Sequence, residues 1–419
     1  LTGRSEAHES VAEPGAREAS SAGVQHPYVE QRSDDEVRPP RRSRVRPGGP
    51  LAGPARRRQE SCAAVGQWPH PDSLATIPAE DPRVYEMLSR ADSIGVFQVE
   101  SRAQMSLAPR LKPRNFYDLV ISVGIVRPGP IQGGMVHPYL RRRDGREEVR
   151  YPYPPLQPVL AKTLGVPLFQ EQIMRLAVVA AGFTPGEADE LRRVMTHRGS
   201  HERIAAMRTR LLAGMAERGI ASADAEIIFN QLLGFAGYGF PESHSASFAL
   251  LVYASAWLKR YHPAAFTCAL LNSQPMGFYA PHTLVEDAKR HGVEARGVDV
   301  AASGWESTLE GVRPGLPAAP GEAPALRLGL HAVRGLPREV GEGILRAREA
   351  APFASMGDLV RRATLSRAWL VRLAEAGALG ALASDRRSAV WRSLAVEADG
   401  GDLFAGVTPP EPDAPLAPA

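Results

Sequence analysis

The spacing of apolar and polar residues predicts a mainly helical chain from about Asp72 onward. The first clear helix start is at Asp81, because an aspartate suits the N-cap and the proline that follows it suits the first turn. Val84, Met87 and Leu88 then recur at helical spacing and fall on one face. We therefore expect an amphipathic helix here.

A second helix start is predicted at Thr184-Pro185-Gly186-Glu187, which forms a capping box with proline at the first helical position. This helix carries the adjacent Arg192 and Arg193. The most apolar helix is expected at about Ala246 to Leu258. It is shorter than the ~20 residues that a membrane span requires, and serines interrupt it.

Residues 1 to about 70 lack this periodicity and are rich in Pro, Gly, Ser and Arg, with basic runs at Arg38–Arg46 and Arg56–Arg58. We expect this segment to be disordered, because burial of so few apolar residues cannot offset the conformational entropy that the chain would lose on folding. A basic tail of this kind can bind nucleic acid nonspecifically through counterion release. The alternative, which we favour, is that this segment is unrelated low-complexity sequence produced by a frameshift or a mis-called start.

Composition fits a DNA-handling protein inside the cell. The 419 residues suffice for two or three domains of about 150 residues. Arginine dominates a small basic excess and suits bidentate phosphate contacts, although a GC-rich genome also favours arginine. The two cysteines, Cys62 and Cys268, lie far apart, which excludes a disulfide framework and a Cys-rich zinc site. Without a signal-peptide pattern, we expect a cytoplasmic location.

The stretch from Gly237 to Phe248 combines glycines, aromatics, a histidine and three serines directly before the apolar helix. Glycine allows backbone to approach a ligand closely, and the start of a helix offers N–H groups to an anion. His244 or Ser243 could then contact a phosphate. A glycine turn with a serine N-cap is the structural alternative, and these residues alone do not separate the two.

Several blocks, in one order along the chain, carry a family resemblance. They are Gly95–Arg102, Arg127–Gly134, Leu168–Gln172, Leu191–Met195 and Phe235–Phe248, the last followed by Val252-Tyr253, Trp257–Lys259 and His262–Phe266. Together they resemble the bacterial C-family DNA polymerases, which comprise the alpha subunit of DNA polymerase III and its error-prone relative. The resemblance extends from about Asp72 to about Leu382, with a weak echo near Phe404.

Three segments are most similar to the error-prone branch of that family: Ser101–Met105, Gly239–His244 and Gln274–Tyr279. The resemblance implies a mainly α fold with minor β structure. It also implies an order of parts: a disordered segment at residues 1–70, a helical fingers domain at 71–298, a helix-hairpin-helix module at 299–395 and a flexible tail at 396–419.

Nucleotidyl transfer requires two divalent ions held between carboxylates. The family supplies these carboxylates from a palm domain that precedes every matched block. No Asp-x-Asp pair occurs in an apolar strand context, and the acidic run Asp34-Asp35-Glu36 lies among arginines and prolines, so we interpret it as solvated. Mg²⁺ is thus expected for an intact polymerase, with no ligands and no catalytic residues in this chain, which alone should be inactive.

The resemblance assigns the incoming nucleotide to a set of polar residues: Arg192, Arg193, His244, Arg127, Ser243, Arg102, Glu100 and Gln98. Each assignment has a structural alternative. Arg192 and Arg193 could form a solvated basic face, or one could pair with Asp189. His244 could be structural, and Arg127 could make an ion pair that stabilises a turn. Alternation alone would interpret Gln98 to Arg102 as a half-exposed strand end.

After about Asp299 the pattern indicates paired helix-hairpin-helix units. Such units present backbone N–H groups at glycine turns to DNA phosphates, without reading sequence. The candidate DNA-binding residues are Arg334, Gly335, Arg338 and Gly377, and a helix is expected near Arg338 to Arg348. Glycine C-caps between packed helices are the alternative.

The tail contains Leu403 and Phe404 where the family places a short sliding-clamp motif, but the leading glutamine of that motif is missing, so we favour an ordinary frayed tail. Two function classes remain. The first is part of an error-prone DNA polymerase, acting in damage tolerance, with primer-template DNA, deoxynucleotides and a sliding clamp as partners; the replicative alpha subunit is its variant. The second is a noncatalytic DNA-binding fragment.

Overall fold

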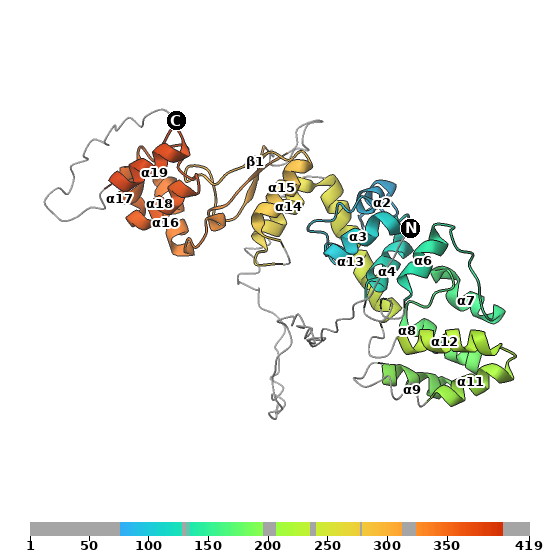
Figure 1. Ribbon diagram of the computed structural model, residues 1–419. Helices are drawn as coiled ribbons and strands as arrows, with labels where there is room; N and C mark the ends of the chain where they lie inside the picture. Colours follow the sequence, from blue (N-terminus) through green and yellow to red (C-terminus); the bar gives the residue numbers. More distant parts are fainter. Residues whose placement is uncertain are drawn as a thin grey trace, which may run out of the picture. The chain divides into compact units, whose positions relative to one another are not determined.

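The computed structural model describes residues 76–127, 131, 134–195, 207–234, 240–276, 279–311 and 324–396 (Figure 1). The segment predicted to be disordered, residues 1–70, and the candidate clamp residues Leu403 and Phe404 lie outside these ranges. The described chain is mainly α-helical with three short strands, which confirms the predicted fold class. Among its helices none is both long and apolar enough to cross a membrane.

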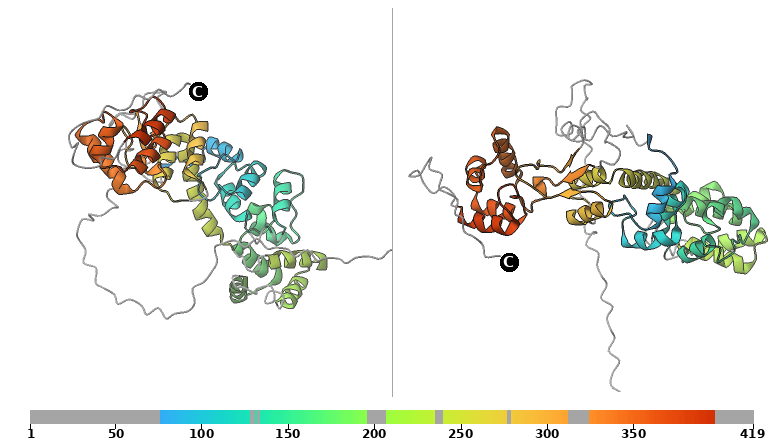
Figure 2. Two further views of the ribbon diagram at one scale, coloured as in Figure 1. Left: turned by 60° about the vertical axis from the view of Figure 1, so that its left-hand side comes forward. Right: turned by 90° about the horizontal axis from the view of Figure 1, so that it is seen from above.

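The first hydrophobic core extends from Val84 to Trp257. Its helices are α2 (Pro82–Ser89), α3 (Arg102–Leu111), α4 (Phe116–Ile125), α6 (Val136–Arg143), α7 (Gln157–Leu160), α8 (Gln170–Ala181), α9 (Pro185–Met195), α11 (Arg208–Glu217), α12 (Ser222–Gly234) and α13 (Glu242–Tyr261), with 3-10 turns at Pro154–Leu156 and Ala161–Thr163. Helix α13 packs along α4 and α2 (Figures 1 and 2).

The two predicted helix starts are confirmed. Asp81 caps α2 by accepting a hydrogen bond from the Arg83 N–H at 2.8 Å, and Val84, Met87 and Leu88 are buried as expected. At α9, the Thr184 N–H donates to Glu187 Oε2 at 2.7 Å and the Glu187 N–H donates to Thr184 Oγ1 at 3.2 Å. These reciprocal bonds are those of a capping box.

The apolar helix is longer than the sequence predicted. Instead of covering about Ala246 to Leu258, α13 begins at Glu242 and ends at Tyr261, with Pro241 at its N-cap. Its buried positions include Ser245, Ala249, Val252, Ala256 and Lys259, which recur at helical spacing. Packing of this whole face stabilises both ends, so Ser243 and His244 lie in the first turn and not before it.

A small second core follows. Helices α14 (Pro263–Asn272) and α15 (Pro281–Arg290) pack against a three-stranded sheet of β1 (Ala295–Arg296), β2 (Thr308–Glu310) and β3 (Ala325–Arg327). The strand order is β1-β3-β2, with β1 parallel and β2 antiparallel to β3. Leu326 of the central strand is fully buried in this core.

The third core lies in the last group of helices, which Figure 1 draws in orange to red. It contains a 3-10 turn at Leu330–Ala332 and helices α16 (Arg338–Ala350), α17 (Met356–Ala363), α18 (Arg367–Glu375) and α19 (Arg386–Ala395). The helix predicted near Arg338 to Arg348 is therefore confirmed as α16. The ring of Trp305 packs on Gly341 of α16, where no larger side chain would fit without displacing that ring.

Candidate nucleotide- and DNA-binding surfaces

Arg192 and Arg193 both pair with Asp189 on their own helix, α9. Arg192 Nε lies 2.8 Å from Asp189 Oδ1, and Arg193 Nη2 lies 2.9 Å from Asp189 Oδ2. Hydrogen bonds from Arg192 lower the pKa of the Asp189 carboxyl. The sequence suggested that one of the two arginines could pair with Asp189; in the structure both arginines do so. Arg193 is nevertheless 72% exposed, so its guanidinium can still reach a ligand.

An open apolar groove lies beside this cluster. It has a volume of about 410 Å³ and forms between α7, α8 and α9. Its walls are Val159, Met174, Val178, Val179, Pro185 and Ala188, with Arg175 and Asp189 as the charged residues. The predicted arginines therefore lie next to an apolar surface and not on a uniformly solvated face.

A row of rings runs from Phe240, just before α13, over His244 and Phe248 of α13 to Phe97 of a distant turn. We call these four rings, with Arg127 at one end, the aromatic row. The Arg127 guanidinium carbon lies 4.5 Å from the centre of the Phe240 ring. Successive ring centres follow at 5.3 Å (Phe240 to His244), 4.1 Å (His244 to Phe248) and 5.1 Å (Phe248 to Phe97). Residues more than a hundred positions apart in the sequence thus meet on one surface.

Arg127 is half-buried, and among the described residues no carboxylate pairs with it. Its Nε donates to the Val123 carbonyl oxygen at a long 3.4 Å, and burial lowers the pKa of its guanidinium. The turn-stabilising ion pair considered above is therefore not found in the described part of the chain; Pro128 to Pro130 lie outside that part. A half-buried cation without an acid is suited to an anionic ligand.

The start of α13 is already partly occupied. The Glu242 N–H donates to Glu171 Oε2 at 2.9 Å, so a carboxylate sits at this helix N-terminus. Ser245 is buried and donates to the Val120 carbonyl oxygen at 2.6 Å. Ser243 and His244 are exposed. Of the residues predicted here, only these two side chains can meet a ligand.

Gln98, Glu100 and Arg102 do not form the strand end that alternation suggested. They lie in a turn that leads into α3, with Ser101 as the N-cap and Arg102 as the first helical residue. Gln98 has a φ of +65°, which a strand does not permit. Burial raises the pKa of the Glu100 carboxyl, against a backbone hydrogen bond from Gly95. Arg102 is exposed.

The two predicted glycine turns of the last module are exposed and have left-handed backbone. Gly335 has a φ of +76° and Gly377 a φ of +74°, and a Cβ at either position would meet no atom within 4 Å. At Gly377 the turn is also a Schellman C-cap, because the Ala378 N–H donates to the Leu373 carbonyl. The C-cap interpretation of this glycine is therefore confirmed, and its contact with DNA stays a prediction.

The two arginines predicted beside the first glycine turn differ. Arg334 is exposed, and no ion pair involves it in the described residues. Arg338 forms an exposed pair with Glu342, at 2.8 Å, one helical turn along α16. Arg334 is therefore the better placed of the two for a phosphate contact.

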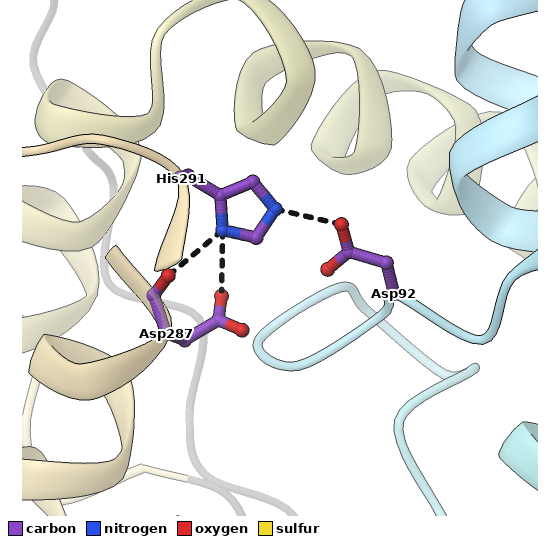
Figure 3. A group of neighbouring side chains, drawn as sticks. All are labelled: Asp92, Asp287 and His291. Carbon is purple, nitrogen blue, oxygen red and sulfur yellow. Dashed lines mark hydrogen bonds and ion pairs between the residues drawn. The ribbon is translucent and has the colours of Figure 1, made fainter. Parts of the chain in front are cut away.

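A buried charged cluster joins α13 to α15 and to the turn after α2 (Figure 3). Lys259 Nζ lies 2.8 Å from Asp92 Oδ1, 2.8 Å from Asp287 Oδ2 and 3.0 Å from the Ile94 carbonyl oxygen. His291 Nε2 lies 2.6 Å from Asp92 Oδ2, and its Nδ1 lies 2.8 Å from the Asp287 carbonyl oxygen. Both ring nitrogens face acceptors, an arrangement that favours the charged form of His291.

The pKa shifts of His291 and Asp92 agree with an ion pair between them. The hydrogen bond to Asp92 raises the pKa of His291, against burial, which lowers it. Burial alone would raise the pKa of Asp92, but His291 and Lys259 lower it to about 2. Asp92 and Asp287 thus face Lys259 and His291, and Asp287 also pairs with Arg290 at 3.0 Å, so basic side chains balance both carboxylates.

This cluster does not fit a divalent ion. Asp92, Asp287 and His291 are the single group among the described residues whose spacing could hold a metal. However, the Lys259 ammonium already contacts both carboxylates, and Mg²⁺ prefers oxygen ligands without a competing cation. The cluster is an internal ion network that holds helices together, and no catalytic step can be assigned to it.

Sequence reasoning missed several of these residues. Phe248 follows the predicted His244 by four positions, which places both on one face of α13, and this spacing could have revealed part of the row; Phe240 lies just before the helix. Phe97 could not be found in this way, because it comes from a distant loop. Lys259 was noticed only as part of a matched block, since its partners Asp92 and Asp287 are far away in the sequence.

Comparisons with known proteins agree with this architecture. The family described as "Bacterial DNA polymerase III alpha subunit finger domain" matches residues 68–219, and the family "Helix-hairpin-helix motif" matches residues 292–389. The chain therefore contains a finger domain of the bacterial DNA polymerase III alpha-subunit type and a helix-hairpin-helix region.

Within this family the chain is similar to error-prone DNA polymerases, as the three diagnostic segments predicted. It is 84% identical over 348 residues to the error-prone DNA polymerase of Anaeromyxobacter dehalogenans, which covers 83% of this chain and 31% of the relative. The enzymes of Aromatoleum aromaticum and Pseudomonas aeruginosa are 55% and 57% identical, over 86% and 78% of this chain. The chain spans about a third of the length of these relatives.

Proposed function

We propose that this chain is the part of an error-prone, DNA-directed DNA polymerase that binds the incoming deoxynucleotide and the primer-template, and that the whole enzyme acts in DNA damage tolerance. The observation that carries the proposal is Arg127. Its half-buried guanidinium has no carboxylate partner in the described chain and lies against Phe240, one ring away from His244. A triphosphate would supply the missing anion.

The predicted arginines of α9 support the same site. Helix α8 begins beside the start of α13, because the Gln170 N–H donates to the Phe240 carbonyl oxygen at 3.0 Å. Helix α9 packs on α8 after a three-residue connection. A short helical hairpin returns the second helix toward the start of the first. Arg192 and Arg193, near the end of α9, are therefore expected on the same side as His244.

We expect Arg127→Gln to weaken deoxynucleotide binding by about tenfold or more, because a charge-assisted hydrogen bond contributes about 1.5–3 kcal/mol. The double variant Arg193→Ala with His244→Ala should weaken it similarly while sparing duplex DNA binding. Titration with a fluorescent deoxynucleoside triphosphate would measure this.

The matched control for that titration is Arg90→Ala, because Arg90, like Arg193, is an exposed arginine that pairs with an acid four residues earlier on its helix. It should leave nucleotide affinity unchanged. Unchanged affinity in Arg127→Gln, or an equal loss of duplex affinity in the double variant, would show that the nucleotide site is assigned wrongly.

For the helix-hairpin-helix module we propose contacts to duplex phosphates through Arg334, Gly335, Arg338 and Gly377. Arg334→Ala should weaken duplex binding equally for all sequences and reduce the slope of log affinity against log salt by about 0.9, because one phosphate contact is lost. Fluorescence anisotropy over a salt series would measure it. Arg361→Ala is the control, since Arg361 is exposed but paired with Asp358; a similar drop in slope there would remove the special role of Arg334.

We also propose that the chain alone does not extend a primer, and that Mg²⁺ and a sliding clamp serve the longer protein. The one metal-spaced cluster in the described residues is neutralised by Lys259, as described above. Primer extension with Mg²⁺ and four deoxynucleotides should give no product with this chain and should give product with a version extended upstream. Product from the short chain would reveal a metal site outside the described residues and would end this proposal.

A further inference from the structure

The aromatic row continues into an exposed apolar face of α13 that the nucleotide site does not use. Phe97 is 38% exposed, and Leu251, which follows Phe248 by three positions and so lies on the same face of α13, is 39% exposed. Exposed apolar residues that gather on one face, unlike scattered ones, mark an interaction surface. This face starts at His244 and follows the helix away from Arg127.

Phe97 is held against α13 by its own backbone. Its N–H donates to the Ser255 hydroxyl oxygen at 3.3 Å, and its ring meets the Phe248 ring edge-on at an interplanar angle of 71°. The left-handed turn at Gln98 directs the chain away immediately afterwards. The ring is therefore placed on the surface by a specific local structure and is not a random exposed side chain.

The charges of the face favour a negatively charged ligand over a basic or neutral one. After Glu242, α13 contains no acidic residue, and its exposed positions near the row are Ser243, His244, Ser247, Leu250 and Leu251. Arg127 stands at one end of the row and exposed Arg102 follows Phe97 by five positions. Rings flanked by cations and small hydroxyls form the pattern on which bases of a single nucleic-acid strand stack.

The length of the row favours a DNA strand over a single nucleotide as its ligand. One nucleotide offers one base, whereas the row presents four rings in succession beyond the Arg127 guanidinium. We propose that the aromatic row, with Leu251, is a stacking surface for unpaired bases of a single DNA strand. This deepens the proposed function, on which it rests, by adding a strand to the face that holds the nucleotide.

The experiment compares two volume-conserving pairs. Phe97→Leu with Phe248→Leu removes the aromatic rings, and Phe97→Tyr with Phe248→Tyr keeps them. Binding of a thymidine oligonucleotide that carries one 2-aminopurine would be followed by fluorescence with the 419-residue chain. The leucine pair should bind about tenfold more weakly and lose quenching of the probe, because each stacked base contributes about 1–3 kcal/mol, while the tyrosine pair should bind as the parent does.

Three results would overturn the inference. These are parent-like single-strand affinity in the leucine pair, an equal loss in the tyrosine pair, or a parallel loss of mononucleotide affinity, which would make the row part of the nucleotide site only. The salt dependence should not change, since no phosphate contact is removed. If the leucine pair unfolds, Phe97→Leu alone decides the question, because Phe97 is on the surface.

Failure here is distinct from failure of the proposed function. The stacking test measures oligonucleotide affinity in the phenylalanine variants, and the nucleotide test measures triphosphate affinity in Arg127→Gln. Loss of triphosphate binding in Arg127→Gln together with parent-like strand binding in the leucine pair would sustain the first proposal and reject the second.

Discussion

Replacing Lys259 with methionine is expected to lower the free energy of unfolding by about 3 kcal/mol, since removal of the cation shared by two carboxylates leaves them with only His291 and Arg290 as partners. The Lys259 side chain is 2% exposed and its ammonium contacts Asp92, Asp287 and a backbone carbonyl oxygen. We expect the lower end of the usual range because Asp92 is 32% exposed and partly screened by water. Urea denaturation would measure the change.

The control is Lys289→Met on α15. Lys289 pairs with Glu286, but both side chains are about half exposed, so the expected loss is at most about 1 kcal/mol. Adding Asp287→Asn to Lys259→Met should recover part of the lost stability, because the buried Asp287 carboxylate, left with only Arg290 and His291 as partners, is then neutral. Equal losses of stability in Lys259→Met and Lys289→Met would show that the buried ion network does not hold these helices together.

Loss of the Lys259 network should also affect the proposed binding face. Lys259 belongs to the helix that carries His244 and Phe248, and its partners lie outside that helix, in the turn after α2 and on α15. The network therefore fixes α13 relative to its neighbours. A preorganised helix loses less entropy when a ligand binds, so Lys259→Met should weaken nucleotide binding only where it loosens the fold.

Replacing Gly214 with alanine is expected to destabilise the chain by about 2 kcal/mol, which is the size of a typical overpacking penalty. A Cβ at Gly214 of α11 would lie 1.9 Å from the Ala181 carbonyl oxygen of α8, which is backbone and cannot turn aside. The same carbonyl accepts a hydrogen bond from Arg210 at 3.2 Å, which the displaced helix would strain. Thermal and urea unfolding would both report the loss.

Gly357→Ala is the matched control, because Gly357 is also helical but its Cβ would meet nothing closer than the Ser355 hydroxyl at 3.8 Å. Alanine is the better helix former, so this variant should gain about 0.5–1 kcal/mol. Opposite signs for the two glycines would confirm that close approach of α11 to α8 explains Gly214. A gain at both positions would contradict the packing described.

Local signals predicted helix starts well and helix lengths less well. The caps at Asp81 and Thr184 depend on residues within three positions, so the sequence alone reveals them. The extent of α13 depends on burial against α4, which no local pattern contains. For the same reason the segment Gln98 to Arg102 looked like a strand end but is a turn and a helix start.

For the candidate site, too, the sequence predicted some features and packing decided others. Arg127, His244 and Ser243 were chosen from matched blocks, and the structure leaves all three accessible, with Arg127 half-buried. It also places a carboxylate of Glu171 at the start of α13 and turns Ser245 into the core. A sequence shows which residues are polar, but hydrogen-bond partners far along the chain decide which of them remain available.

The sequence by itself determined the helical class, the family, the helix caps and the glycine turns at Gly335 and Gly377, because each rests on residues that are close together in the chain. Only the tertiary structure decided that Phe97 joins Phe248 and that Lys259 neutralises Asp92 and Asp287. These contacts join residues more than a hundred positions apart, or helices that meet only after packing. They follow from how buried faces pair, which local spacing does not encode.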